Sequence, residues 1–276
     1  MLGLRIDRLP YGTISYEEFA KNFSGINITS TSKIPKIIFR TAEFKINALP
    51  IQIKNILTRT TVNNPEYIQV YLDSSERIRF IKDEFPEYLN GYLSVIPGAY
   101  QADIVRLLLI YKYGGLYNDI VNQYLELINQ YIHDDDELII TKDFIDSGKF
   151  SISNGFIGAY QNHPILKAMI NLVMYNVNNK IYGSNYLDIT GPNTLGRAFN
   201  RFFNKDDYSE IKEGIYVLKQ ESIKYKIKVF YYDAQFITFN NKNFIKFKFE
   251  RYNNIMYLKK KLKHYTAHWK ERSVYK

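Results

Sequence analysis

The sequence predicts an α/β fold, in which strands and helices alternate along the chain and the strands form a sheet of parallel type. Residues 34–41 (IPKIIFRT) form an apolar run with the length and composition of a buried strand. Residues 99–113 place Ile104, Leu107 and Leu108 on one face of a helix, ahead of a Gly-Gly pair that ends it. With 276 residues, 46% of them hydrophobic, the chain can bury a core of this kind.

One domain is expected over residues 31–276, preceded by an N-terminal extension at residues 1–30. No internal repeat, low-complexity linker or change in composition divides the chain further. Pro86 is expected to end the helix before it, because proline cannot continue a helix. The other expected elements are a helix at 16–22, a helix at 49–60, a strand within 63–73, a helix at 74–85, strands at 116–121 and 138–141, a strand and a helix within 150–174, a helix within 188–199, and strands over the last third of the chain.

The net charge of +9 is concentrated near the C-terminus. Residues 219–276 contain 15 Lys and Arg against 4 Asp and Glu, a local charge of +11, so the rest of the chain carries −2. Such a region can face a nucleic acid, an anionic membrane surface or a phosphorylated ligand, but the default interpretation is a solvated face with a basic tail. Lysines alternate with aromatic residues at 244–250, which predicts a half-buried strand rather than a nucleic-acid motif.

Composition excludes several functional classes. Because the chain has no cysteine, it has no disulfide bond, no thiolate nucleophile and no cysteine-ligated zinc, and its four scattered histidines are too few for a histidine-rich metal site. No apolar run approaches the roughly 18 residues of a membrane span, and the N-terminus shows no signal-peptide pattern, so a soluble, intracellular protein is expected. The abundance of Tyr, Phe, Ile, Asn and Lys indicates an A+T-rich genome rather than a function.

The most informative segment is residues 99–121 (AYQADIVRLLLIYKYGGLYNDIV). Asp103 and Arg106 are three residues apart and therefore project from the same side of the predicted helix. Asp119 follows in the next strand, and the carboxyl ends of parallel strands are where α/β proteins bind ligands. These three side chains are therefore candidates for one ligand site. The acidic run at 133–137 (HDDDE) also contains Asp-x-Asp, but it is expected to be a solvated loop.

Six segments occur in an order that is typical of one family: IPKIIFRT (34–41), NPEYIQVYLD (64–73), QADIVRLLLIYKYGGLYNDIV (101–121), ISNGFIGAYQNHPILKAM (152–169), DITGPNTLGRAF (188–199) and HWKERSV (268–274). They resemble the DXD-containing sugar transferases, which include fungal initiating α-mannosyltransferases, bacterial capsular-polysaccharide transferases and, more distantly, the large clostridial glucosylating toxins. The resemblance implies a GT-A-like, Rossmann-type nucleotide-sugar-binding domain with a mixed, mainly parallel sheet flanked by helices. It also implies an enzyme that moves a sugar from a UDP- or GDP-sugar to a glycan or protein-linked hydroxyl group with retention of configuration, usually with Mn²⁺ or Mg²⁺.

The resemblance also assigns roles to individual residues. Carboxylates and cations are expected around a nucleoside diphosphate, because its negative charge grows as it leaves and must be neutralised. No second carboxylate nucleophile is evident, which indicates front-side attack, in which the leaving phosphate helps to deprotonate the acceptor hydroxyl. The implied assignments are catalysis by Asp103, Arg106, Asp119 and Asn154; donor binding by Asp103, Arg106, Tyr117, Asn118, Asp119, Thr190, Gly191 and Pro192; and metal binding by Asp119, His268 and Ser273.

The chain departs from the family pattern at four positions. Val121 stands where the second Asp of the DXD motif, normally the direct metal ligand, is expected. Phe39 and Ala42 replace a His and a Trp in the first strand, and Val274 replaces a Trp near the C-terminus. With one carboxylate missing, metal affinity should fall or the metal should be dispensable, with C-terminal lysines neutralising the pyrophosphate. Restoring the carboxylate by Val121→Asp should then increase Mn²⁺ dependence.

Two other functions stay open. A transferase-derived protein that has lost catalysis would hold a nucleotide sugar or glycan without turnover, and the degenerate motif favours it. A basic nucleic-acid-binding protein would bind generic DNA or RNA with steep salt dependence, although no specific nucleic acid is expected as a partner. Structural interpretations also stay open for single residues: a surface ion pair for Asp103 with Arg106, a strand-entry turn at Asn154, core packing for Trp269, and a structural role for His163 before Pro164.

Overall fold

The computed structural model describes residues 10–23, 32–144, 148–247 and 263–276. Helices and strands alternate along most of the chain, as expected. The α-helices are α1 (Tyr16–Asn22), α2 (Ile51–Asn63), α3 (Ser74–Glu84), α4 (Leu89–Ser94), α5 (Gly98–Tyr113), α6 (Pro164–Asn178), α7 (Pro192–Phe202) and α9 (Tyr265–Lys270). The strands are β1 (Thr13–Ser15), β2 (Ile37–Thr41), β3 (Ile68–Leu72), β4 (Gly115–Asn118), β5 (Gln123–Tyr124), β6 (Leu138–Lys142), β7 (Ile152–Ala159), β8 (Gly214–Gln220), β9 (Ile223–Tyr232), β10 (Phe236–Phe239) and β11 (Lys242–Lys246).

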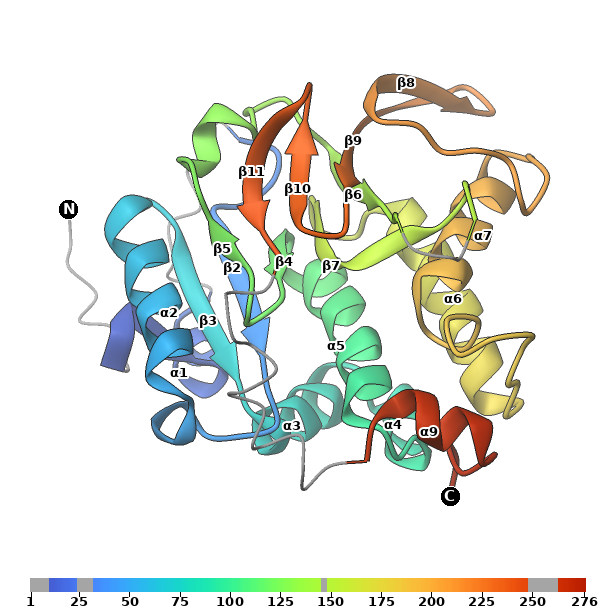
Figure 1. The fold of residues 1–276 in the computed structure, drawn as a ribbon, viewed down its shortest axis with the longest axis horizontal. Helices are drawn as coiled ribbons and strands as arrows, with labels where there is room; N and C mark the ends of the chain where they lie inside the picture. The colour runs from blue at the N-terminus through green and yellow to red at the C-terminus, as the bar shows by residue number, and fades with distance from the viewer. Residues whose placement is uncertain (1–9, 24–31, 145–147, 248–262) are drawn as a thin grey trace.

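The eleven described strands form a mixed sheet, which is the framework of the fold (Figure 1). The strand order is β1-β3-β2-β4-β7-β6-β9-β10-β11-β5, and β8 pairs with β9. The pairs β1–β3, β3–β2, β2–β4 and β6–β9 are parallel, and the other six pairings of described strands are antiparallel. The α/β class and the mixed sheet flanked by helices are confirmed. The sheet is not mainly parallel, because strands joined by tight turns, such as β10 and β11, can pair only in antiparallel fashion.

Helix α5 packs against both the sheet and α6, in the middle of the molecule (Figure 1). Its predicted apolar face is confirmed, since Ile104, Leu107 and Leu108 are fully buried. Gly114 ends the helix with a φ of 68°, a left-handed conformation that glycine adopts without strain. Because β4 starts directly after α5 and runs back along it, the carboxyl end of β4 lies beside the first turns of α5.

The described part of the N-terminal segment belongs to the core. β1 pairs in parallel with β3 at the edge of the sheet. Helix α1 has its predicted bounds, and the side chain of Ser15 caps it by accepting from the amide of Glu18 at 3.1 Å. Tyr16 and Phe19 of this helix are buried. The expected boundary at residue 30 lies outside the described residues, so the division into an extension and a domain stays a prediction.

Two local expectations are wrong. β4 stops before Asp119, which begins a turn instead of ending a strand, because its carbonyl accepts from the amide of Asn122 at 2.9 Å. The acidic run lies in a loop but is not wholly solvated, since Asp136 is 1% exposed and accepts from Nζ of Lys228 at 2.6 Å. That lysine lies 92 residues further along the chain, so local composition does not reveal the pair.

The C-terminal residues return to the body of the protein, where α9 contacts α5 (Figure 1). Trp269 packs against the main core, as expected, and its Nε1 donates to the carbonyl of Tyr182 at 2.8 Å. Residues 248–262, which include the end of the alternating segment and most of the lysine run at 259–263, lie outside the described residues. Among the described helices, none has the length and apolarity needed to cross a membrane, and the cellular compartment stays a prediction.

Candidate functional site

Segments that are distant in the sequence meet at the carboxyl end of β4. Asp103 and Arg106 come from α5, and Asp119 directly follows β4. Strand β7 is antiparallel to β4, so Asn154, near its start, lies at the same edge. Thr190, in the loop before α7, completes the group through a hydrogen bond to Asp103. The structure thus brings together the four residues predicted as catalytic and Thr190, which was predicted to bind the donor.

Ion pairs and hydrogen bonds join these side chains. Arg106 lies between two carboxylates, with its Nη2 3.3 Å from Oδ1 of Asp103 and its Nη1 3.5 Å from Oδ1 of Asp119. It also donates to the backbone carbonyl of Asn154. The hydroxyl of Thr190 donates to Oδ2 of Asp103 at 2.7 Å. The side chains of Asp103 and Arg106 are only 13% and 7% exposed, which excludes an ordinary ion pair on a helix surface.

The two carboxylates differ in how far solvent reaches them. Burial raises the pKa of Asp103 to about 6, although the charge of Arg106 and the hydrogen bond from Thr190 act in the opposite direction. Asp119 is more accessible, with 27% of its side chain exposed. The site therefore holds two carboxyl groups around one guanidinium, and Asp119 is the one that a ligand reaches first.

Tyr117 and Asn118, which were predicted to bind the donor, are buried and contact other residues of the site. The hydroxyl of Tyr117 donates to Oδ1 of Asp119 at 3.0 Å, and the guanidinium carbon of Arg106 lies 4.5 Å from the centre of its ring. Oδ1 of Asn118 accepts from Nδ2 of Asn122 at 2.8 Å. Both residues therefore orient the charged side chains and the turn at 119–122, and direct contact with a donor stays a prediction.

Asn154 offers an acceptor that no described residue uses. Its Nδ2 donates to the carbonyl of Thr190 at 3.1 Å, whereas its Oδ1 is buried without a hydrogen-bond partner among the described residues. Buried polar atoms are rarely left in this state, and contact of Asn154 with a sugar stays a prediction. The neighbouring Gly155 has no room for a side chain, since a Cβ there would lie 2.9 Å from Cε2 of Phe247 and 3.2 Å from Oδ2 of Asp119.

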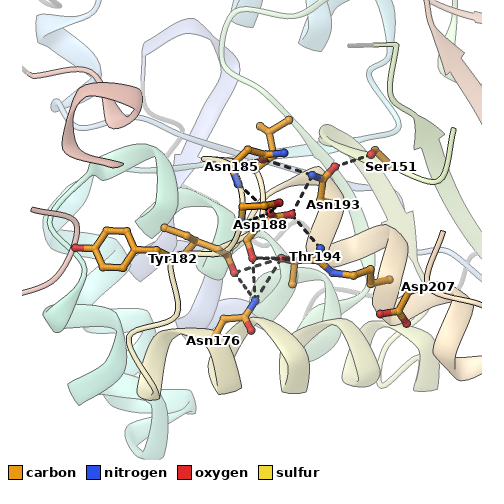
Figure 2. A network of polar contacts seen from close by, with 12 residues as sticks. Ser151, Asn176, Tyr182, Asn185, Asp188, Asn193, Thr194 and Asp207 are labelled. Carbon is orange, nitrogen blue, oxygen red and sulfur yellow. Dashed lines mark hydrogen bonds and ion pairs between the residues drawn. The ribbon is translucent and has the colours of Figure 1, made fainter. Parts of the chain in front are cut away.

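The loop that carries Thr190 is held by the buried side chain of Asp188 (Figure 2). Its carboxylate accepts from the amide and hydroxyl of Ser184 at 2.8 and 2.7 Å and from Nδ2 of Asn193 at 3.0 Å. Burial acts to raise the pKa of Asp188, but these hydrogen bonds hold it below its ordinary value. Asn176 of α6 donates to the backbone carbonyl of Asp188 at 3.0 Å, which ties the loop to the core.

Gly191 and Pro192 form the entrance to α7. Gly191 is the N-cap residue and has no side chain to cap the helix, and Pro192 occupies the first turn. A Cβ on Gly191 would lie 3.1 Å from the carbonyl oxygen of Leu187, so the loop packs closely here. Pro192 has no amide hydrogen, and the amides of Thr194 and Leu195 donate to the carbonyl of Gly191 at 3.0 and 3.2 Å, so this terminus offers few free amides to an anion. Contact of these residues with a donor stays a prediction.

His268 and Ser273, the remaining predicted metal contacts, pair with each other. Nδ1 of His268 lies 3.1 Å from the hydroxyl and 3.0 Å from the carbonyl oxygen of Ser273. In the part of the chain that the structure describes, no group of three or more His, Asp or Glu side chains could hold a metal ion. At Asp119, Oδ1 is already engaged by Arg106 and Tyr117. The described residues therefore do not by themselves form a ligand set for a divalent cation, and metal binding by Asp119, His268 and Ser273 stays a prediction.

Val121, at the position of the missing carboxylate, packs into an apolar cluster. It is 7% exposed and shares this cluster with Ile53, Leu57 and Tyr71. Ala42, where the family pattern has a Trp, packs against the same cluster. The two departures from the pattern therefore fall on one apolar surface. Val121→Asp would place a charge inside it, so the substitution is no simple repair of a metal ligand.

Two residues that support the candidate site were not predicted from the sequence. Arg40 lies in the buried run of β2 and donates to the backbone carbonyls of Asp119 and Asn122. The sequence did contain one indication of this role, since a basic residue within an apolar strand is unusual. Asp188 opens the DITGPN segment, but its partners lie on a loop and two helices, so their convergence could not be inferred from spacing.

Comparison with known proteins identifies the region around this site. A family model described as a glycosyltransferase sugar-binding region containing a DXD motif matches residues 50–145, which include Asp103, Arg106 and Asp119. This confirms the family resemblance drawn from the sequence motifs, while Val121 remains a departure from the motif that gives the family its name.

The relatives found by sequence are fungal mannosyltransferases. Inositol phosphoceramide mannosyltransferase 3 of Schizosaccharomyces pombe is 30% identical over 166 residues, which cover 59% of this chain and 44% of that protein. Mannosyl phosphorylinositol ceramide synthase CSH1 of Saccharomyces cerevisiae is 25% identical over 184 residues, covering 65% and 46%. The match thus spans less than half the length of these relatives. Among solved structures, PaToxG glycosyltransferase is similar, with a TM-score of 0.44 and 18% identity over 67% of this chain and 77% of that chain.

Proposed function

We propose that this chain is a nucleotide-sugar-dependent glycosyltransferase, which moves a sugar from a UDP- or GDP-sugar to a hydroxyl group with retention of configuration. The observation that carries the proposal is the cluster of Asp103, Arg106 and Asp119, which lies within the family match and meets Asn154 and Thr190 at one edge of the sheet. A reachable carboxylate, a cation and a free buried acceptor together suit a ligand rich in hydroxyl groups and negative charge.

Each residue has a role in the proposed reaction. Asp119 accepts from hydroxyl groups of the donor, and Asn154 accepts from another through its free Oδ1. Arg106 supplies positive charge beside the donor, and Asp103 holds Arg106 and Thr190 in place. The bond from the sugar to the diphosphate breaks as the bond to the acceptor oxygen forms on the same face. The acceptor proton passes to the leaving phosphate, and in the proposed reaction Arg106, rather than a metal ion held by the protein, offsets the negative charge that grows there.

The names of the relatives guide the choice of substrates. Both act, by their names, in adding mannose to inositol-containing ceramides. For this chain we place mannose first among the donor sugars and inositol-containing lipids first among the acceptors, with other glycans and protein-linked hydroxyl groups behind them. The common chemical feature of these acceptors is a ring or chain that carries several free hydroxyl groups.

The direct test is turnover of the donor. The chain is incubated with UDP- and GDP-sugars, with EDTA or with Mn²⁺ and with each acceptor class, and release of nucleoside diphosphate is measured. One nucleotide class should be consumed, and Asp119→Ala should lower the rate by about 100-fold or more, as expected for the loss of a residue that contacts the donor. Asp207→Ala is the matched control, because Asp207 pairs with Arg201 at 2.6 Å outside the site. Turnover that survives Asp119→Ala unchanged would overturn the site assignment.

A second function is favoured by one observation, the apolar packing of Val121. If the missing carboxylate is essential, the protein would bind a nucleotide sugar without turning it over. Stabilisation of the fold by a donor, together with no release of nucleoside diphosphate under any condition, would establish this binding function. The nucleic-acid alternative has less support than the composition indicates, because Lys226 and Lys228 are paired with Asp135 and Asp136.

A further inference from the structure

Arg40, near the end of β2, is a fully buried cation without an anionic partner. Its side chain is 0% exposed, and no carboxylate of the described residues forms an ion pair with it. It donates instead to uncharged acceptors. Nη1 reaches the backbone carbonyls of Asp119 and Asn122 at 2.8 and 3.0 Å, and Nε and Nη2 reach the side chains of Gln69 and Thr60 at 2.9 and 3.2 Å.

Such a residue is costly for the fold. Burial of a guanidinium destabilises the folded state when no counter-ion balances it, and a hydrophobic side chain usually stabilises a core better. The same burial lowers the pKa of Arg40, while the negative charge of Asp119 acts to raise it. The presence of a cation at this position therefore indicates that the turn at 119–122, whose carbonyls it contacts, needs its hydrogen bonds.

The turn at 119–122 is the element that carries Asp119 into the candidate site. The amide of Asp119 donates to the carbonyl of Gly155 at 2.9 Å, and Nδ2 of Asn122 donates to the same carbonyl at 3.1 Å. Val121 anchors the middle of the turn in the apolar cluster. Arg40 of β2 holds both ends of this turn, because its Nη1 donates to the carbonyls of Asp119 and Asn122.

We propose that Arg40 is a positioning residue of the donor site, whose buried guanidinium fixes the turn at 119–122 and with it the carboxylate of Asp119. The inference rests on the proposed function, because it concerns the binding of the nucleotide-sugar donor. In a chain that has Val121 where a second carboxylate is expected, the turn is set from within the protein by Arg40.

A purely structural role makes a different prediction, and Arg77 provides the control. Arg77 is also 0% exposed, but it pairs with Glu43 at 2.5 Å and contacts no residue of the site cluster. If both arginines only support the fold, Arg40→Gln and Arg77→Gln should both lose stability and keep the donor affinity of the folded protein. If Arg40 positions the turn, Arg40→Gln alone should lose affinity.

The experiment compares wild type, Arg40→Gln, Arg40→Lys and Arg77→Gln, using the full chain and the UDP- or GDP-sugar that wild type turns over. Donor affinity is measured by calorimetry and kcat and KM by product release, at a temperature where circular dichroism shows each variant folded. Arg40→Gln should weaken donor binding by about tenfold or more, because two hydrogen bonds that set the site are lost. Arg40→Lys, which keeps the charge but not the planar fork, should recover part of this loss, and Arg77→Gln should match wild type.

Equal donor affinity and equal kcat in Arg40→Gln and wild type would overturn the inference and leave the proposed function intact. If Arg40→Gln does not fold, Arg40→Lys decides the question: donor binding at least about threefold weaker than that of wild type supports positioning, and unchanged binding overturns it. If wild type itself binds no nucleotide sugar, the proposed function fails and the inference fails with it.

Discussion

Asp103 links the stability of the protein to pH through its burial. Its pKa in the folded protein is about 6, above the ordinary value of 3.8. Between these two pH values the folded state keeps a proton that the unfolded state releases, so stability falls as the pH rises from 3.8 to about 6. Asp103→Asn removes this dependence. We expect urea unfolding to show that wild type loses about 1 kcal/mol relative to Asp103→Asn between pH 5 and pH 7.5. If the difference in unfolding free energy between wild type and Asp103→Asn is constant with pH, the pKa of Asp103 is not raised in the folded protein.

Val121 is the residue at which the motif and the packing disagree. Its burial beside Leu57 and Tyr71 means that Val121→Asp should lower the free energy of unfolding by about 3 kcal/mol or more, rather than add a metal ligand. Val121→Ala, the control for lost packing alone, should cost about 2 kcal/mol. The measurement is urea unfolding with and without Mn²⁺. Stabilisation of Val121→Asp by Mn²⁺, absent in wild type, would mean that the new carboxylate reaches the site.

Helix α6 shows how a buried side chain supports an element. His163 is its N-cap residue, and Nδ1 accepts from the amide of Ile165 at 3.2 Å, so its expected structural role is confirmed. Burial lowers the pKa of His163 to about 4, so the folded state stays neutral where the unfolded state takes up a proton, and stability falls as pH falls from about 6.5.

His163→Asn keeps a capping acceptor but does not titrate. It should be less stable than wild type at pH 7.5, because the ring packed against Tyr160 is lost. Unfolding by urea should show this deficit shrinking by about 2 kcal/mol at pH 5. A deficit that grows at pH 5 would contradict the account.

Elements with local signals were the ones that could be predicted from the sequence. α1 has its expected bounds, and α3 begins where Asp73 and Glu76 form a capping box and ends before Pro86. The contiguous motif also predicted Asp103, Arg106 and Asp119 as neighbours, because one helix and the turn after the next strand carry them. What could not be predicted was the antiparallel character of the second half of the sheet and the long-range partners of buried charges, since these depend on register.

At the scale of the whole molecule, the fold brings together acidic and basic segments that are far apart in the sequence. Lys226 and Lys228 of the basic C-terminal region pair with Asp135 and Asp136 of the acidic run, because parallel pairing of β6 and β9 places these segments together. Part of the C-terminal positive charge is therefore internal. An anionic or membrane surface as a partner of the remaining basic residues stays a prediction.

The central claim is that the cluster around Asp119 binds a nucleotide sugar without a metal ion held by the protein. The most direct measurement is the melting temperature of wild type and Asp119→Ala with a series of UDP- and GDP-sugars, each with EDTA and with Mn²⁺. One nucleotide class should raise the melting temperature of wild type with increasing concentration, equally in EDTA and Mn²⁺, and should leave Asp119→Ala unchanged. No stabilisation by any donor, or an equal shift in Asp119→Ala, would contradict the claim, and a shift that requires Mn²⁺ would contradict its metal-free form.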